Sequence, residues 1–596
     1  MAGFTLEHPS TRELTGGDLL AQCLKHMGVE VAFGLHGGHL DAFLMGCESI
    51  GIKLIDTRHE TVAVQAAEGY SKIRDTIGVC FVTANSGYSN GLPGLATAYA
   101  DRSPILCITS SPPLRDAENN SLQGQIDQVV VARPLTKFAH RVTHAEDAPR
   151  LVSHAIRTAL AGAPGPVLLD FPIDVLFSPV TERLISWGSI TSPLSYAPGP
   201  HAKAVEDTLA LLKAAKRPVI ITGTGGRSKE AGEALMKLAK TCGIPLFHSQ
   251  KYLATVPADF ELLGTHAGLL GVLPLLKKEQ PDLALLLGVR TGMFLGGKSG
   301  GIIPNEGCKI VHVDVDSGEI GRTLPTDLGV TSDVTQMANA LNASLESGFQ
   351  GSVDASWVQA ALSVKSLPSP FDTAPEEQSP GRIHPYHALK KVYSSIEPGC
   401  IIINDGGECG AWSNGLAATS KPFAVMSACG YLGFLGNGFG YSLGCAIAAP
   451  DRKIINIQGD GSAGFHFMEL DTYKRFNLNI MTIVVNNFCW GMSSNGQELI
   501  YGTKNPARPV SDLSPTTEYE TVAKGLGNAA AKVDKIADVE STVKKLQGTP
   551  GPSCINLVVD QKPIHPVTAI MVSVTDDPDT IVVPYYDNLP RPRYKN

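Results

Sequence analysis

The sequence predicts an α/β protein built from three open, parallel sheets. Short runs of Val, Ile and Leu, without polar alternation, recur along the 596 residues, and helical patterns separate them. A chain of this length needs more than one core, and two irregular, proline-rich stretches at 192–203 and 366–385 divide it. Strands that helices cover on both faces explain these observations together.

Each predicted sheet has its own set of strands. The first set is 78–84, 104–110 and 165–172, and the second is 217–225, 283–290 and 309–316. The third set is 400–407, 452–461, 478–487 and 552–559. We therefore expect domains at 1–190, 200–365 and 380–563, followed by a proline-rich, aromatic arm at 564–596 that serves as a surface arm, a lid or a partly disordered tail.

Composition indicates a cytoplasmic enzyme that acts on small molecules. Charged residues make up 18% of the chain, the formal net charge is −8, and like charges form no block, which argues against nucleic acid and membranes as partners. Twelve cysteines without paired spacing favour a reducing compartment over a disulfide framework or a structural zinc site. Residues 1–17 lack the pattern of a secretory signal, and no apolar run is long enough to span a membrane.

Two polar motifs follow neighbouring strands of the third predicted sheet. GDGSAGF occupies 459–465, and NNFCWGM occupies 486–492. Parallel strands end at one edge of a sheet, where α/β proteins bind ligands, so Asp460 and Asn487 would offer two oxygen ligands and a loop carbonyl a third. Mg²⁺ suits such ligands, and Gly459 and Gly461 leave room for a diphosphate beside backbone amides. Each half alone is more often an ordinary turn; the joint spacing favours a site.

This spacing resembles the metal–diphosphate motif of thiamine-diphosphate enzymes of the acetolactate synthase-like family. RHE at 58–60 resembles the family's glutamate signature, and the chain looks closest to benzaldehyde lyase at 34–43, 56–70, 122–130, 134–142 and 430–440. The resemblance covers roughly residues 12–563. It implies a pyrimidine-binding first domain, a middle domain and a diphosphate-binding third domain. It further implies thiamine diphosphate and Mg²⁺ as cofactors, and a homodimer or homotetramer whose subunits share each active site.

The resemblance also assigns roles to residues. Glu60 matches the carboxyl group that hydrogen-bonds the cofactor's pyrimidine ring; without the family, it would be an acid favoured by a helix start. The small residues that follow it, Ala63, Ala66 and Ala67, suggest a helix that packs closely at a subunit interface. The metal ligands implied are Asp460, Asn487 and the backbone carbonyl of Cys489. The cofactor-binding positions implied are Gly406, Gly433, Leu435, Gly459, Gly461, Ser462, Trp490 and Gly491, with Leu435 as the apolar prop that bends the cofactor.

Substrate-side residues are inferred with the same resemblance. His39, in HGGH, and Gln123 match polar groups that face the substrate, although a lone histidine in a strand–helix turn is more often structural. Glu408, Met492 and Ser493 depart from benzaldehyde lyase near the expected pocket, which argues against benzaldehyde itself as the substrate. The acid at 408 would either bind an amine or hydroxyl donor or face solvent.

The expected activity is a thiamine-diphosphate-dependent lyase or carboligase that cleaves or forms C–C bonds of 2-hydroxy ketones. Alternatives on the same scaffold are a 2-hydroxyacyl-CoA lyase, an acetolactate synthase-like enzyme and a 2-keto acid decarboxylase. Joint retention of Glu60, Asp460 and Asn487 argues against a catalytically silent relative. GTGGRS at 223–228 is weak evidence for a nucleotide, so we expect a structural middle domain and disfavour a dinucleotide-dependent oxidoreductase.

Overall fold

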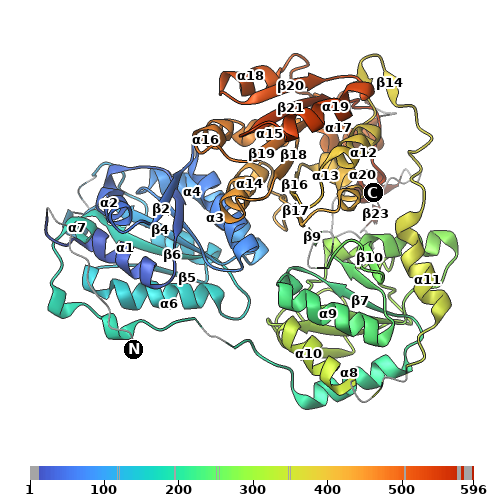
Figure 1. Cartoon of the computed structure of the whole chain (residues 1–596), viewed down its shortest axis with the longest axis horizontal. Coiled ribbons are helices and arrows are strands. Elements are labelled where there is room, and N and C mark those ends of the chain that lie inside the picture. Colours follow the sequence, from blue (N-terminus) through green and yellow to red (C-terminus); the bar gives the residue numbers. More distant parts are fainter. Residues whose placement is uncertain are drawn as a thin grey trace.

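The computed structural model of the whole chain describes residues 12–116, 119, 121–193, 196–249, 251–253, 256–345, 348, 351–502, 505–572, 579–582 and 593–595. The chain folds into three α/β domains that follow one another in sequence (Figure 1). The first eleven residues, and with them most of the stretch predicted not to be a secretory signal, lie outside the described residues. Among the described helices, none is both long and apolar enough to cross a membrane.

The first domain contains a six-stranded parallel sheet in the order β2-β1-β3-β4-β6-β5. Its strands are β1 (Val31–Gly34), β2 (Lys53–Asp56), β3 (Gly78–Val82), β4 (Ile105–Ser111), β5 (Phe138–Arg141) and β6 (Val167–Pro172). Every residue of β3, β4 and β6 is buried, as their apolar runs require. The helices α3 (Glu60–Arg74) and α4 (Ser86–Asp101) begin at the carboxyl edge of this sheet.

The middle domain contains a second six-stranded parallel sheet, in the order β10-β8-β7-β11-β12-β13. Its strands are β7 (Pro218–Thr222), β8 (Leu246–His248), β10 (Leu263–His266), β11 (Leu283–Leu287), β12 (Lys309–Asp314) and β13 (Leu328–Thr331). Two of the helices that cover it are α9 (Lys229–Cys242) and α10 (Val334–Leu345), which pack against each other.

The third domain contains a seven-stranded sheet in the order β20-β21-β19-β18-β16-β17-β9. Six strands are parallel: β16 (Ile401–Asp405), β17 (Ala424–Ser427), β18 (Ile454–Gly459), β19 (Ile480–Asn486), β20 (Ala529–Val533) and β21 (Ser553–Val558). The seventh, β9 (Tyr252–Leu253), comes from the middle segment of the chain and runs antiparallel to β17. The middle domain thus closes one edge of the third sheet.

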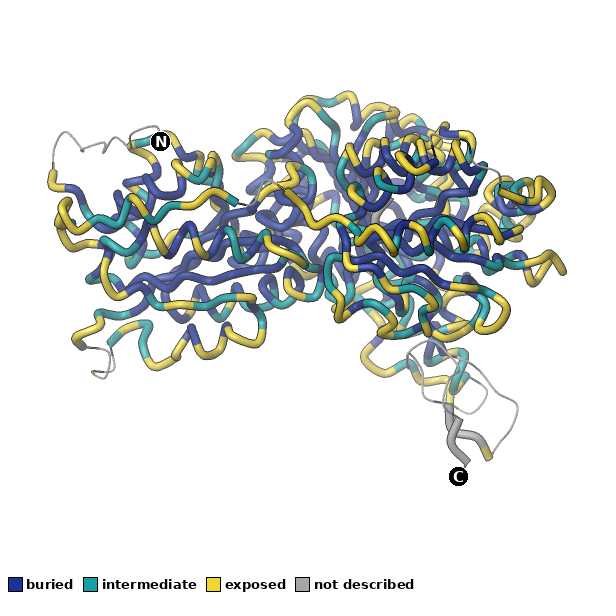
Figure 2. Tube along the Cα trace, turned by 90° about the horizontal axis from the view of Figure 1, so that it is seen from below, coloured by how far each residue is buried: buried dark blue, intermediate teal, exposed yellow. Residues whose placement is uncertain are grey.

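The predicted fold class is confirmed, and each predicted strand is present to within a few residues. The stretch 366–385, predicted to be irregular, contains a small hairpin of β14 (Glu377–Ser379) and β15 (Arg382–Ile383). The C-terminal arm begins with α20 (Pro566–Val572), and β22 (Thr580–Val582) pairs with β23 (Arg593–Lys595). Figure 2 shows the central strands as buried and the outer helix faces and loops as exposed.

The helix that begins at Glu60 packs against α14 (Asn437–Ala448) of the same chain, so the expectation of a subunit interface for its small residues is wrong. Glycines allow the close approach. A Cβ at Gly444 would lie 2.0 Å from the carbonyl oxygen of Ala66, and one at Gly69 would lie 2.6 Å from that of Tyr441. The small residues of α3 therefore join the first and third domains within one subunit.

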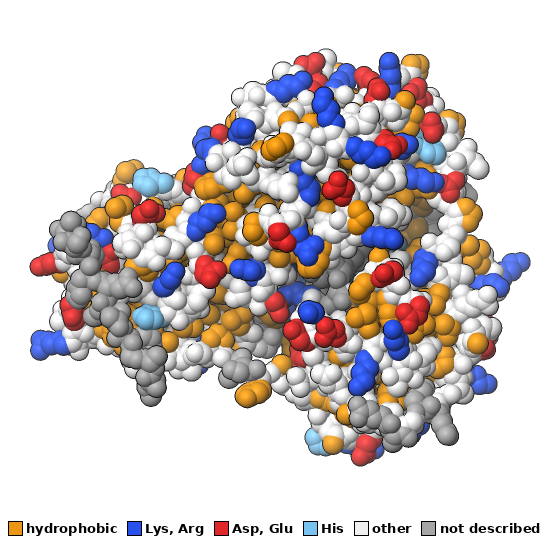
Figure 3. Space-filling model, in the orientation of Figure 1, with side chains coloured by type: hydrophobic (Ala, Val, Ile, Leu, Met, Phe, Trp, Pro, Cys, Tyr) orange, Lys and Arg blue, Asp and Glu red, His pale blue; other side chains and the backbone are white. Residues whose placement is uncertain are grey.

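Buried charges meet where the three domains join. Asp101, at the end of α4, forms ion pairs with Lys72 of the first domain (3.6 Å) and Lys251 of the middle segment, and accepts the N–H of Tyr431 of the third domain at 3.0 Å. Arg102 adds ion pairs of 2.7 Å each to Asp316 and Glu319. On the outside, Figure 3 shows acidic and basic side chains interspersed over the visible face, in agreement with the predicted absence of a like-charge block.

Candidate active site

Asp460 lies at the carboxyl edge of the third sheet, where β18 gives way to α15 (Asp460–His466). It is buried, and its Oδ1 accepts the N–H of Gly461 at 3.0 Å. Its Oδ2 is buried without a hydrogen-bond partner among the residues that the structure describes. Burial raises the pKa of Asp460 to about 7, although hydrogen bonds from neighbouring backbone N–H groups lower it in part. A cation beside Oδ2 would supply the missing partner and favour the charged carboxylate.

Asn487 follows β19, the strand next to β18, and so reaches the same edge. Its Oδ1 accepts the N–H of Cys489 at 3.3 Å, and Phe488 between them has a left-handed backbone with φ of +61°. Burial raises the pKa of the Cys489 thiol to about 12, so the thiol is a poor ligand and the backbone carbonyl is the group left to offer. Asp460 and Asn487 therefore lie at the same edge of the sheet. Their role as the two side-chain oxygen ligands of one metal ion stays a prediction.

At several glycines of this edge, other groups come so close that a side chain would meet them. A Cβ at Gly461 would lie 2.5 Å from the ring of Trp490, and one at Gly491 would lie 2.8 Å from Nδ2 of Asn487. Gly406 has φ of +111°, and a Cβ there would lie 3.2 Å from both the backbone N of Gly459 and Oγ of Ser462. The Ser462 hydroxyl is buried without a partner among the described residues. Open backbone, a helix start and a spare hydroxyl suit a diphosphate group.

Asp405, at the end of β16, was not predicted as a site residue. It is fully buried and accepts the N–H groups of Gly438 (2.7 Å) and Gly436 (3.3 Å). These bonds fix the end of the segment that carries Gly433, which is exposed with φ of +69°, and Leu435, which is half-buried. An acid that directly ends a predicted apolar strand was the signal available for Asp405.

Glu60 is the first residue of α3 and is buried. Its Oε2 accepts a hydrogen bond from Nδ2 of Asn90 on α4 at 3.1 Å. Its Oε1 lies 3.2 Å from the position of a Cβ at Gly87, a closer approach than most side chains make. Asn90 had no sequence signal of its own, because an asparagine on a helix surface is ordinary.

The other two predicted catalytic residues lie around the start of α4. Nε2 of Gln123 donates to Oγ of Ser86 at 3.2 Å, and the backbone carbonyl of Gln123 accepts from Nδ2 of Asn85. His39 lies in the short helix η1 (Gly38–Leu40), and burial lowers its pKa, so its ring is neutral at pH 7. A Cβ at Gly37, two residues before His39, would overlap Oγ1 of Thr83 on the loop that leads to α4. His36 instead pairs with Asp41 at 2.9 Å.

Two sets of polar residues therefore lie at the carboxyl edges of the first and third sheets. Family models for three domains of thiamine pyrophosphate enzymes match the chain: the N-terminal TPP binding domain at 14–131, the central domain at 205–341 and the C-terminal TPP binding domain at 405–557. The large subunit of acetolactate synthase from Mycobacterium tuberculosis is 30% identical over 550 residues, which cover 92% of this chain and 96% of that protein. The chain belongs to the thiamine pyrophosphate enzyme family.

Two further relatives have comparable similarity. The 2-hydroxyacyl-CoA lyase 2 of Caenorhabditis elegans is 30% identical over 582 residues, which cover 89% of this chain and 86% of that protein. The chloroplastic acetolactate synthase of Arabidopsis thaliana is 30% identical over 561 residues, with 91% and 81% covered. The predicted family is confirmed, and with it a thiamine pyrophosphate (thiamine diphosphate) enzyme that acts on carbon–carbon bonds. The closer likeness to benzaldehyde lyase stays a prediction.

In this thiamine pyrophosphate enzyme, Glu408 does not face solvent, so that interpretation of the acid is wrong. The side chain is buried, and its Oε1 accepts the backbone N–H of His565 (2.8 Å) and the hydroxyl of Thr568 (3.1 Å), both at the start of the C-terminal arm. Its Oε2 accepts from Nδ2 of Asn495 at 2.6 Å on α17 (Gly491–Tyr501). The carboxylate is thus used to hold α20 in place rather than left open for a substrate amine.

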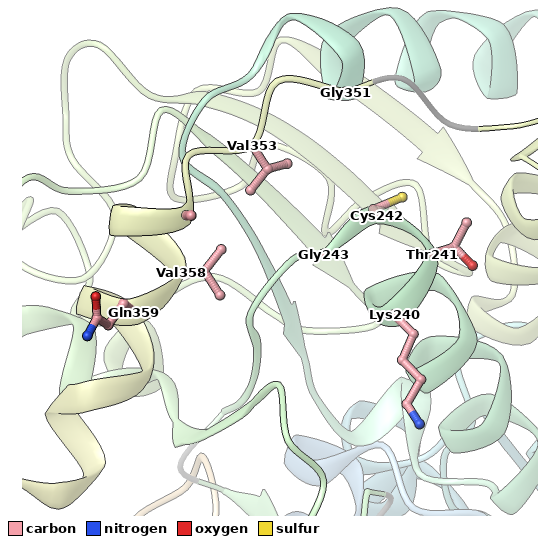
Figure 4. Close-up of a pocket in the computed structure, with 9 residues that line it drawn as sticks. Lys240, Thr241, Cys242, Gly243, Gly351, Val353, Val358 and Gln359 are labelled. Carbon is pink, nitrogen blue, oxygen red and sulfur yellow. The ribbon is translucent and has the colours of Figure 1, made fainter.

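Three arginines of the middle domain each contact a group of the same chain. Arg227 pairs with Asp75 at 2.8 Å, and Arg322 forms an ion pair with Glu319. Arg290 stacks over the ring of Tyr431, 3.6 Å from its centroid. An open hollow of about 640 Å³ lies between the end of α9 and the start of α11 (Ala355–Ser363), away from the predicted site residues (Figure 4). The structural role expected for this domain stays a prediction.

Proposed function

We propose that this enzyme forms or cleaves the C–C bond of 2-hydroxy ketones, with thiamine diphosphate and Mg²⁺ as cofactors. One observation carries the proposal: each of the two domains of the TPP-binding type holds a buried acid as the first residue of a helix that begins at the carboxyl edge of its sheet. These acids are Glu60 and Asp460. A carboxyl group for the pyrimidine and a carboxylate for the metal are the two protein acids that this cofactor needs.

The diphosphate end would be held by the third domain. Oδ2 of Asp460, the side-chain oxygen of Asn487 and the carbonyl of Cys489 are the proposed Mg²⁺ ligands. Backbone around the metal and diphosphate would come from Gly406, Gly459, Gly461, Ser462, Trp490 and Gly491. Gly433 and Leu435 would lie against the rings, with Leu435 supplying apolar contact. The cofactor supplies the electron sink that makes C–C cleavage and formation possible, while the protein supplies orientation and electrostatics.

Glu60 has the geometry for proton exchange with a ring nitrogen. Asn90 donates to Oε2, so that oxygen is an acceptor and Oε1 is the oxygen left to carry or receive a proton. On the substrate side, the neutral ring of His39 can give or take a proton at a carbonyl or hydroxyl oxygen. Gln123 can donate its amide hydrogens to the same oxygen. These three residues orient the reactants and move protons.

We infer further that two subunits share each site, as a homodimer or as a homotetramer made of such pairs. Apolar side chains stand exposed next to both halves of the site. Beside the first domain's half they are Leu122, Ile126 and Val130, and beside the third domain's half they are Leu432, Phe465 and Met468. Exposed apolar side chains of this kind favour burial against a second copy.

The names of the relatives suggest two alternative activities, acetolactate synthesis and 2-hydroxyacyl-CoA cleavage. A CoA substrate needs cations for its phosphates. The three arginines of the middle domain considered for that role, Arg227, Arg290 and Arg322, are already bound to groups of the chain itself. This favours the 2-hydroxy ketone. A cytoplasmic location is supported by twelve cysteines that are all free thiols.

A substrate panel tests the activity. Aldehydes, 2-hydroxy ketones, 2-keto acids and 2-hydroxyacyl-CoA esters are each incubated with enzyme, thiamine diphosphate and Mg²⁺, and products are identified by mass spectrometry. We expect turnover of 2-hydroxy ketones or of aldehyde pairs. Turnover confined to pyruvate or to acyl-CoA would refute the proposal in favour of the corresponding relative's activity.

A binding experiment tests the cofactor site itself. Calorimetry with thiamine diphosphate should give Mg²⁺-dependent binding to the wild type and none to Asp460→Ala. Asp451→Ala removes an exposed acid just before the same strand and is the matched control. Equal, Mg²⁺-dependent binding by all three proteins would contradict the assigned metal site.

A further inference from the structure

The segment that leads into Glu60 is held by an acid from the third domain. Glu469, the first residue of α16 (Glu469–Arg475), accepts with its Oε1 the backbone N–H groups of Arg58 (2.9 Å) and His59 (3.1 Å). Its Oε2 accepts the hydroxyl of Thr472 at 2.7 Å. The Glu469 residue is 1% exposed, so its carboxyl oxygens lie out of water.

These two N–H groups belong to the residues that determine where α3 begins. His59 is the N-cap of α3, with extended backbone (φ −147°, ψ 138°), and its Nδ1 accepts the N–H of Thr61 at 3.1 Å. The hydroxyl of Thr57 donates to the carbonyl of His59 at 2.9 Å. The dihedrals of Arg58 and His59 fix the direction in which the Glu60 side chain leaves the helix.

We propose that Glu469 is a positioning residue that orients the carboxyl group of Glu60. The proposal rests on the proposed function, because it concerns the residue assigned there to the pyrimidine ring. An acid nine residues after Asp460 thereby links the loop that begins at the metal position to the acid of the first domain. The path is short: α15 begins at Asp460 and ends at His466, and α16 begins at Glu469.

Other contacts between α15–α16 and the segment 56–59 are weaker. Arg475 pairs with Asp56 at 2.7 Å, and Arg58 approaches Asp471 at 3.9 Å, but these side chains are partly or largely exposed, and exposed ion pairs contribute little. The rings of His59 and His466 lie 5.2 Å apart, at the side of the same segment. Glu469 is the buried group that satisfies backbone donors of this segment directly.

Three variants isolate the contact. Glu469→Leu removes both acceptor oxygens, whereas Glu469→Gln keeps Oε1 in place for the two N–H groups. Asp471→Asn, which neutralises a partly exposed acid on the same helix, is the control. We expect Glu469→Leu to lower kcat by about 10²-fold, the size typical of a small misplacement of a catalytic group. KM and the affinity for thiamine diphosphate should stay near wild type, and Glu469→Gln should retain most of the wild-type kcat.

Hydrogen exchange in the cofactor-free protein gives a second readout. In Glu469→Leu, the amides of Arg58 and His59 should exchange faster than in wild type, while Glu469→Gln should match wild type. A double variant adds a third: once Glu60→Gln is present, Glu469→Leu should lower kcat no further. If Glu469→Leu does not fold, Thr472→Val is the substitute, because it removes only the hydroxyl that donates to Oε2. It should also lower kcat.

Several outcomes would overturn the positioning role. They are wild-type kcat in Glu469→Leu, an additive loss in the Glu60→Gln background, or a loss of cofactor affinity that parallels the loss of kcat. The proposed function fails by a different result, namely wild-type kcat in Glu60→Gln itself. An inactive Glu60→Gln with a fully active Glu469→Leu would therefore reject the inference about Glu469 and leave the proposed function standing.

Discussion

Asn90 and Glu60 are joined across two helices by a hydrogen bond of 3.1 Å from Nδ2 of Asn90 to Oε2 of Glu60. The bond gives the two carboxyl oxygens different roles. Oε2 accepts the hydrogen bond from α4, and Oε1 lies beside Gly87, 3.2 Å from where a Cβ would stand. The asymmetry favours a carboxyl group that exchanges its proton at one oxygen, and this can be tested at both residues.

Replacing Glu60 with Gln should leave the fold intact and lower turnover by about 10²–10⁴-fold, the contribution typical of a positioned acid or base. Gln keeps the shape of the side chain, but it cannot exchange a proton. The measurement is kcat at saturating thiamine diphosphate and Mg²⁺, with the thermal midpoint as the check on folding. Turnover near that of wild type would remove Glu60 from the mechanism.

Asn90→Ala should lower kcat by several-fold to about tenfold, because a hydrogen bond to an ionisable group contributes roughly 1 kcal/mol when it is partly exposed. The affinity for diphosphate and metal should not change, since those groups bind to the third domain. Ser89→Ala, one residue earlier on α4, is the matched control. Equal kinetics of the two variants would show that Glu60 does not depend on Asn90.

The apolar runs predicted the fold well because strands buried on both faces leave a strong local pattern. Every residue of β3, β4 and β6 is buried, and those strands were found. Shorter strands were not predicted. β9 has two residues, and it exists because β17 offers it an edge, which is a contact between segments some 170 residues apart and leaves no mark in either one.

In the site, too, residues with a local sequence pattern could be predicted, and residues whose role depends on distant contacts could not. Asp460 and Asn487 could be predicted because each directly follows an apolar strand, and neighbouring parallel strands must end at one edge. Asn90 and Glu469 could not, because their roles depend on which residues of other helices they meet. Glu408 was misinterpreted for a related reason: its partners, His565 and Thr568, lie some 160 residues away in the arm.

Glu408→Ala should release the C-terminal arm. The change leaves the donors of His565, Thr568 and Asn495 without their acceptor, a loss of about 2–4 kcal/mol for a buried carboxylate with three partners. Limited proteolysis should then cut near α20 in the variant but not in the wild type. An arm that stays resistant to protease would show that its packing does not need the carboxylate.

Deletion of 570–596 tests what the arm does once it is in place. If it acts as a lid, the truncated enzyme should differ from wild type in turnover or in the range of acceptor aldehydes, and Glu408→Ala should resemble it. The matched variant is Glu408→Gln, which keeps one acceptor oxygen. Unchanged kinetics in the truncated enzyme would mean that the arm is not a lid and has no role in turnover.

Glu469 should also make stability depend on pH. Burial raises its pKa from an ordinary 4.5 to about 7, against the bonds from Thr472, Arg58 and His59 and the charge of Arg475. The folded protein therefore holds a proton that the unfolded chain releases near pH 4.5. The stabilisation is fully present below pH 4.5 and is lost as pH rises to about 7, by about 3 kcal/mol for such a shift. Glu469→Gln cannot ionise and does not lose this stability. Its thermal midpoint should therefore rise relative to that of wild type as pH increases from 4.5 to 7.

Glu540 provides a control of opposite sign, because Lys391 and Lys544 lower its pKa to about 2. A carboxyl group with a lowered pKa stabilises the fold above its ordinary pKa, and this contribution is lost as pH falls toward 2. Glu540→Gln should therefore lose a little stability relative to wild type above about pH 4.5, where Glu469→Gln begins to gain. Thermal midpoints of the three proteins from pH 4 to 8 separate the two effects. Parallel curves for both variants would mean that Glu469 is already charged at pH 5, and that burial does not govern its ionisation.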